Sequence, residues 1–108
     1  MVKQGDIIKL NFDPQVGSEQ KGSRPALVVS NDKFHKISIK RAWVCPITRT
    51  DRGYPVHICL DKRTNTDGVI LCDQIKTVDL EARSFEFIEI APDDVLRDVL
   101  DIIADFMV

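Results

Sequence analysis

Two polar stretches of this 108-residue chain combine a guanidinium with a carboxylate or a hydroxyl, which are groups that can act on a phosphodiester. The first, Gly17–Pro25, holds Glu19, which can accept a proton, and Arg24, which can neutralise a phosphate through paired donors. In the second, Cys45–Pro55, Thr48 offers a hydroxyl where an apolar run ends. Neither stretch is specific alone, because an arginine at the base of a loop, like Arg24, is more often a surface or ion-pair residue.

Further polar side chains nearby could bind a nucleic acid strand. Arg49 and Arg52 add positive charge, and Tyr54 offers a ring on which an unpaired base can stack. Gln74 and Lys76 place an amide and an ammonium on the same side of a third, extended segment. Each of these features alone also fits a solvated surface turn.

The histidines and cysteines are expected to have no catalytic or metal-binding role. His57 alternates with apolar neighbours and His35 lies in a lysine-bearing stretch that we interpret as a loop, so neither has a catalytic partner in the sequence. Cys45, Cys59 and Cys72 are too widely spaced for a zinc motif, and we expect three buried free thiols. We therefore predict no metal and no cofactor.

Composition and charge predict one soluble domain. The chain is 44% hydrophobic and 30% charged. It has no apolar run near the ~18 residues of a membrane span and no apolar leader, so we expect a cytoplasmic protein that does not contact a membrane. The net charge is −2, and five aspartates and one arginine give residues 92–108 a charge of −4, which leaves +2 on the remainder. Any RNA-binding surface should therefore lie away from the C-terminal segment.

Six short apolar runs are predicted as strands, because Gly, Pro, Asp and Asn separate them. Many short strands with close turn signals favour a small barrel or a strongly bent sheet. The runs are Asp6–Phe12, Ala26–Ser30, Ala42–Thr48, Val56–Leu60, Val69–Cys72 and Phe85–Ile90.

One long amphipathic helix is predicted after Pro92, which suits a first helical turn. From Val95 to Met107 the apolar residues recur at helical spacing with the aspartates opposite, so we expect this helix to cover one opening of the barrel. Asn31–Ser38 predicts a shorter helix with Asn31 as its cap. The predicted fold class is mainly β (α+β), with a C-terminal helix and one or two short helices.

Nine short motifs follow one another from Gly5 to the C-terminal helix. They are Gly5-Asp6-Ile7-Ile8, Phe12-Asp13-Pro14, Gly17-Ser18-Glu19-Gln20, Arg24-Pro25-Ala26-Leu27-Val28, Cys45-Pro46-Ile47-Thr48, Gly53-Tyr54-Pro55, Gly68-Val69, Asp73-Gln74-Ile75-Lys76 and Ala82-Arg83. In order and spacing they resemble the motifs of the MazF/PemK/Kid toxins of type II toxin–antitoxin systems. Each motif is weak alone, but nine in register are highly specific.

The resemblance implies one toxin domain over residues 1–108 with an SH3-like small β-barrel, a homodimer and a MazE-like antitoxin. It implies sequence-specific cleavage of single-stranded RNA, including mRNA, without a metal ion. The RNA's own 2′-hydroxyl would attack, leaving a 2′,3′-cyclic phosphate and a 5′-hydroxyl and stopping translation and growth. By motif match Arg24 and Thr48 are catalytic and Glu19 contributes to activity. Because the pKa of arginine lies above ~12, its side chain is a poor proton acceptor. Arg24 is therefore expected mainly to neutralise the phosphate charge, and Glu19 is the candidate base.

Eight further residues are candidates for binding RNA: Ser18, Gln20, Lys21, Arg49, Arg52, Tyr54, Gln74 and Lys76. Their basic members should also attract an acidic antitoxin segment. Two alternatives stay open. One is a non-enzymatic toxin on the same fold, like the CcdB-like proteins that poison DNA gyrase, and the other is an inactive small-barrel interaction module. The Arg24 and Thr48 motifs favour the nuclease.

Overall fold

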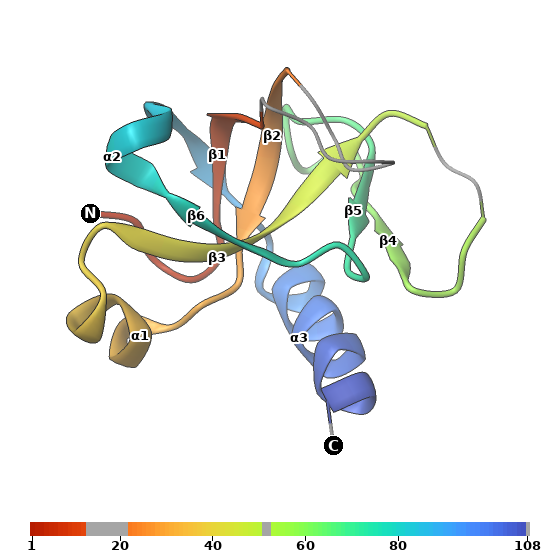
Figure 1. The fold of residues 1–108 in the computed structure, drawn as a ribbon. Helices are drawn as coiled ribbons and strands as arrows, with labels where there is room; N and C mark the ends of the chain where they lie inside the picture. The colour runs from red at the N-terminus through yellow and green to blue at the C-terminus, as the bar shows by residue number, and fades with distance from the viewer. Residues whose placement is uncertain (13–21, 51–52, 108) are drawn as a thin grey trace.

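The structure, a computed structural model, describes residues 1–12, 22–50 and 53–107. Within these ranges the chain forms a bent antiparallel sheet, one long helix and two short ones (Figure 1). In chain order the elements are β1 (Asp6–Asn11), β2 (Ser23–Val28), α1 (Asp32–Ile37), β3 (Arg41–Thr48), β4 (His57–Cys59), β5 (Val69–Leu71), β6 (Lys76–Asp79), α2 (Leu80–Arg83), β7 (Phe85–Ile90) and α3 (Asp93–Met107).

Strand β3 organises the sheet, whose order is β4-β5-β3-β2-β1-β7. One edge of β3 pairs with β2, and the other edge pairs with β6 along its first half and with β5 along its second half. Because β3 changes partner in this way, the sheet bends strongly. Among the described strands, β4 and β7 stand at the two ends of the sheet and do not pair with each other. The sheet is therefore open, where a closed barrel was expected. The mainly β fold class is confirmed.

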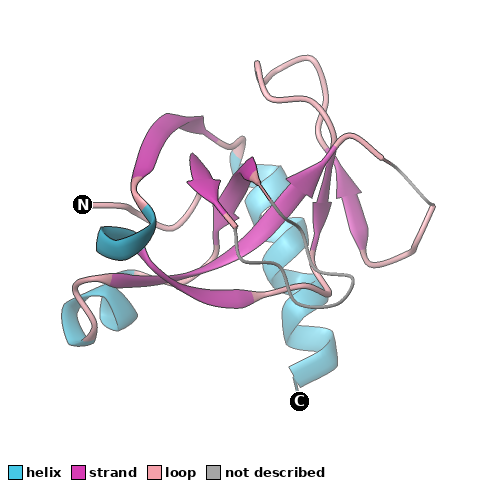
Figure 2. Cartoon of the chain, turned by 45° about the horizontal axis from the view of Figure 1, so that its top comes forward, coloured by secondary structure: helices cyan, strands magenta, loops and turns pink. Residues whose placement is uncertain are grey.

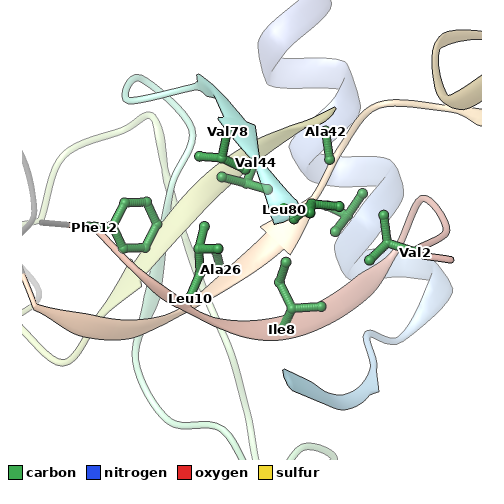
Figure 3. Packing of buried hydrophobic residues seen from close by; sticks show 10 residues of the cluster. Val2, Ile8, Leu10, Phe12, Ala26, Ala42, Val44, Val78 and Leu80 are labelled. Atoms are coloured by element: carbon green, nitrogen blue, oxygen red, sulfur yellow. The ribbon is translucent and has the colours of Figure 1, made fainter. Parts of the chain in front are cut away.

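Both faces of the central strands are buried. On one face Ile8, Leu10, Ala26 and Val44 belong to a first apolar cluster, with Phe12 at one end of it and Val2 at the other (Figure 3). On the opposite face a second cluster contains Ile7, Leu27, Cys45 and Ile70. Side chains alternate between the faces of a strand, so burial on both faces requires the continuous apolar runs seen in the sequence.

Helix α3 covers the second face of the sheet and then runs beyond it (Figures 1 and 2). Val95 and Val99 are buried in the second cluster, whereas Phe106 and Met107 near the end of the helix are exposed. The predicted helix is confirmed, but it packs on a sheet face and not over a barrel opening. None of the helices in the described part of the chain has the length and apolar character needed to cross a bilayer.

Helix α1 begins as predicted, because the Asn31 side chain accepts a hydrogen bond from the Phe34 N–H at 3.2 Å. His35, for which the sequence suggested both a loop and this short helix, lies in the helix. Its buried ring pairs with the Ser30 hydroxyl at 2.6 Å. The sequence did not predict β6 or α2. Val78 is the only apolar residue of β6, and α2 is a single turn whose Asp79 cap accepts from two backbone N–H groups.

Candidate active site

The sheet register brings the two candidate catalytic residues into line. Ala26 of β2 lies opposite Pro46 of β3, and Leu27 lies opposite Cys45. Continued by two residues, this antiparallel register sets Arg24 opposite Thr48, where their side chains point to the same face. Arg24 is exposed and Thr48 is half-buried, so both can reach a ligand from the ends of rigid strands.

Strand β5, which pairs with the other edge of β3, holds Thr48 in position. Val69 of β5 pairs with Thr48, and Gly68 immediately before it has a φ of +126°. A Cβ at position 68 would collide with the Thr48 carbonyl, so only glycine allows this close approach. The Thr48 Oγ1 accepts a hydrogen bond from the Thr50 N–H at 3.3 Å. The hydroxyl proton can therefore be donated to a bound phosphate.

Lys76 lies at the Phe12 end of the first cluster. Its Nζ is 5.4 Å from the centre of the Phe12 ring, and the ring is buried at 2% exposure. The Phe12 N–H donates to the Gly22 carbonyl at 2.9 Å, which closes the base of the β1–β2 connection. The ring thus positions the Lys76 ammonium beside Phe12, just after the end of β1.

A cleft of about 290 Å³ opens beside Arg24, between β1–β3 and the β4–β5 loop. We call it the Arg24 cleft. Thr48 lies between Ile47 and Arg49, which both line it. Three of the lining side chains are cationic, so the cleft suits a phosphate-bearing ligand. Its lining is Lys9, Ser23, Arg24, Pro25, Ile47, Arg49, Asn65, Thr66, Asp67 and Ile88.

Tyr54 belongs to a different group, around His57. The rings of Tyr54 and His57 are 5.1 Å apart, and the His57 Nε2 lies 3.2 Å from an Asp73 carboxylate oxygen. The His57 side chain is only 6% exposed. Asp73 is a partner for His57 that the sequence did not reveal, and the structure packs Tyr54 against this histidine.

The structure therefore groups some of the predicted residues and separates others. Arg24 and Arg49 line one cleft at the ends of β2 and β3, with Thr48 next to Arg49 in the chain, while Tyr54 groups with His57 and Asp73. Ser18, Glu19, Gln20, Lys21 and Arg52 lie outside the described residues. Sequence reasoning missed Lys9, whose only signal is that it is the one charged position between buried neighbours of β1, and it also missed the wall at Asn65–Asp67.

The cysteines are poor nucleophiles. Burial, with the nearby Cys72 and Asp73, raises the pKa of Cys45 far above its usual value of 9.0. Burial raises the pKa of Cys72 to about 11. Both thiols are therefore protonated at neutral pH. Cys59 is exposed, so the expectation of three buried thiols is wrong for this residue. Among the described residues no group of three or more His, Cys, Asp or Glu could hold a metal ion.

Comparison with known proteins identifies the class to which this bent-sheet domain belongs. The model of the PemK-like, MazF-like toxins of type II toxin–antitoxin systems matches residues 3–107. The chain belongs to this family.

Individual relatives cover nearly the whole chain. "Endoribonuclease PemK" of Escherichia coli is 32% identical over 103 residues, which is 92% of this chain and 77% of that protein. The crystal structure of MazF from Deinococcus radiodurans has a TM-score of 0.90 at 34% identity and covers 98% of this chain and 96% of that one. A MazE–MazF crystal structure from the same organism has a TM-score of 0.85 at 34% identity and covers 98% and 95%.

Proposed function

We propose that this MazF/PemK-family endoribonuclease cleaves single-stranded RNA at preferred sequences, without a metal ion, by attack of the RNA's own 2′-hydroxyl on the adjacent phosphate. The attack forms a 2′,3′-cyclic phosphate and expels the 5′-oxygen as a hydroxyl. Because the substrate supplies the nucleophile, the protein must align it and stabilise the charge that grows on the phosphate.

The observation that carries this proposal is the β2–β3 register, whose continuation by two residues sets Arg24 opposite Thr48. A guanidinium donates two parallel hydrogen bonds to a phosphate, and the Thr48 hydroxyl adds a third donor because the Thr50 N–H already occupies its oxygen. Both side chains are held by strands buried on two faces, so little reorganisation is needed when substrate binds. Glu19 is the proposed base, since a carboxylate can accept the proton of the attacking 2′-hydroxyl.

The proposed assembly is a homodimer. The edge strand β7 leaves Phe87 57% and Ile90 69% exposed, and at the end of α3 Phe106 is 75% exposed. Exposed apolar side chains on each of these two elements support a surface that a partner covers. An unpaired edge strand also favours association with a second chain.

A MazE-like antitoxin is the proposed inhibitor, as the solved MazE–MazF complex of the Deinococcus relative suggests. A disordered acidic segment could fold over the cationic surface around Arg24 and Arg49 and exclude RNA from it. We place this competition in the cytoplasm, where the RNA substrate is found.

Cleavage of a long single-stranded RNA, followed by analysis of the product ends, tests the function. Arg24→Ala and Thr48→Ala should each slow cleavage ~100- to 1,000-fold, the usual loss when one donor to a transition-state oxyanion is removed. Arg97→Ala and Thr77→Ala are the matched controls, because both side chains are exposed outside the site. Both should cleave like wild type.

Two results would contradict the proposal. If the Arg24 and Thr48 variants cleave as fast as the controls, the site assignment is wrong. If the wild-type protein leaves RNA intact but inhibits DNA gyrase in a supercoiling assay, the CcdB-like alternative replaces the nuclease.

A further inference from the structure

The wall of the Arg24 cleft opposite the sheet is a short loop that the fold holds in place. Glu89 of β7 accepts hydrogen bonds from the Asn65 N–H at 3.1 Å, the Thr66 N–H at 2.9 Å and the Thr66 hydroxyl at 2.8 Å. Although desolvation opposes it, these hydrogen bonds lower the pKa of Glu89. The backbone of the wall is therefore tied to the sheet edge by an ionised carboxylate.

A second anchor ties the same loop to the start of α3. The Arg63 guanidinium donates to both carboxylate oxygens of Asp94 at 2.8 and 3.0 Å, and also to Asp61 at 2.9 Å. Bidentate geometry makes this pair stronger than an ordinary surface ion pair. The Thr64 hydroxyl adds a bond to the Thr66 carbonyl at 2.7 Å. Together these contacts fix the loop on the α3 side and hold Asn65–Asp67 against the cleft.

The backbone of the wall makes the hydrogen bonds that hold it in place, so two polar side chains are left to contact a ligand. Asn65 and Asp67 are exposed, and neither side chain makes a hydrogen bond or ion pair with the described residues. An amide can donate and accept, and a carboxylate can accept from an N–H or amino group. These are the groups that recognise the Watson–Crick edge of an unpaired base.

The rest of the cleft fits the other parts of a nucleotide. Lys9, Arg24 and Arg49 supply positive charge for a backbone phosphate, and Pro25 with the exposed Ile88 offers an apolar surface for a ring. The volume, about 290 Å³, lies at the small end of the usual range for ligand pockets, which suits one nucleotide rather than several. Arg24 lines the cleft and is also the proposed phosphate-binding arginine, so the cleft adjoins the proposed scissile phosphate.

We propose that the Arg24 cleft holds one nucleotide next to the scissile phosphate, and that Asn65 and Asp67 set the base preference at that position. This inference rests on the proposed ribonuclease function. Lys9 contributes affinity for the backbone of every sequence, whereas the two wall side chains discriminate between bases.

Sequencing all cut sites in a long RNA tests the base preference. Asn65→Ala and Asp67→Asn should relax the preference at one position beside the cut by roughly 5- to 150-fold, the discrimination of one good base contact, and leave the other positions unchanged. Glu89→Ala, which frees the wall, should relax the same position. Asp98→Asn, an exposed aspartate of α3, is the matched control and should keep the wild-type profile.

A binding titration separates backbone contact from base reading. With an RNA whose attacking 2′-hydroxyl is replaced by hydrogen, Lys9→Gln should weaken binding equally for all sequences and lower the salt slope by ~0.7. Lys62→Gln changes a lysine of the β4–β5 loop that lies outside the cleft lining. It should leave both the affinity and the salt slope unchanged. If wild type cleaves RNA and both wall variants keep its profile, the nucleotide site is wrong while the nuclease stands. If wild type does not cleave RNA at all, both proposals fail.

Discussion

Replacing Gly68 with alanine should damage both stability and catalysis, because this glycine lets β5 approach the back of Thr48. Its φ of +126° lies where residues with a Cβ are strained, and the added Cβ would meet the carbonyl oxygen and carbon of Thr48. Backbone strain costs about 1–3 kcal/mol, and forcing a methyl group into packed atoms costs about as much again. We therefore expect a loss of about 2–6 kcal/mol in the free energy of unfolding.

The catalytic effect follows from the same collision. To relieve it, the end of β3 must move, and a shift of about 1 Å in a catalytic group can cost on the order of 100-fold in rate. Under conditions where the variant is still folded, Gly68→Ala should therefore cleave RNA nearly as slowly as Thr48→Ala. Single-turnover cleavage rates, measured with the protein in excess, report this step.

Gly53→Ala is the matched control for stability. Gly53 also has a positive φ, +70°, but no atom of the described residues lies within 4 Å of the place that a Cβ would occupy. It should lose only the ~1–2 kcal/mol of the left-handed conformation. Urea unfolding followed by circular dichroism compares the two variants. Equal losses in both, with cleavage by Gly68→Ala at the wild-type rate, would refute the claim that Gly68 positions Thr48.

Four further outcomes are expected. Excess chelator should leave RNA cleavage unchanged, and magnesium-dependent rescue of a lost activity would contradict the proposed chemistry. Light scattering at micromolar concentration should give the mass of a dimer, which Phe87→Asp should weaken; a wild-type monomer would overturn the assembly. Charge reversal at Arg49 and Arg52 should weaken RNA and antitoxin together, and a competition titration that finds both bound at full affinity would separate their surfaces. The pKa of Glu89 is lowered in the folded protein, so its stabilising effect should be complete above its usual value of 4.5 and disappear as the pH falls through the folded value. Acid titration of Glu89→Gln should show a smaller loss in this range than wild type.

The parts of the fold that the sequence predicted are those with a local signal. The runs of β1, β3 and β7 are apolar or alternating, and α3 repeats its apolar residues at helical spacing, so each pattern is complete within one segment. Strand β6 carries one buried apolar residue, Val78, and forms because residues 41–44 of β3 pair with it across more than thirty residues. Such a long-range partner overrides a weak local preference.

The candidate site divides in the same way. Arg24 and Thr48 were predicted because each lies in a motif of adjacent residues. The His57–Asp73 pair joins residues 16 positions apart, and the lining of the Arg24 cleft combines residues of β1, β2 and the β4–β5 loop. No spacing in the sequence marks these contacts, because the sheet register and the Glu89 hydrogen bonds create them.

A reaction whose nucleophile belongs to the substrate demands placement of groups more than reactive side chains, and this fold is suited to that demand. Ala26 and Ile47 are fully or almost fully buried, and the two catalytic candidates stand within two residues of them, just where burial on both faces ends. Their backbones are therefore as rigid as the core while their side chains reach solvent. The rigidity that positions Arg24 and Thr48 is the packing that stabilises the domain, so core substitutions next to β2 and β3 should reduce the cleavage rate before they unfold the protein.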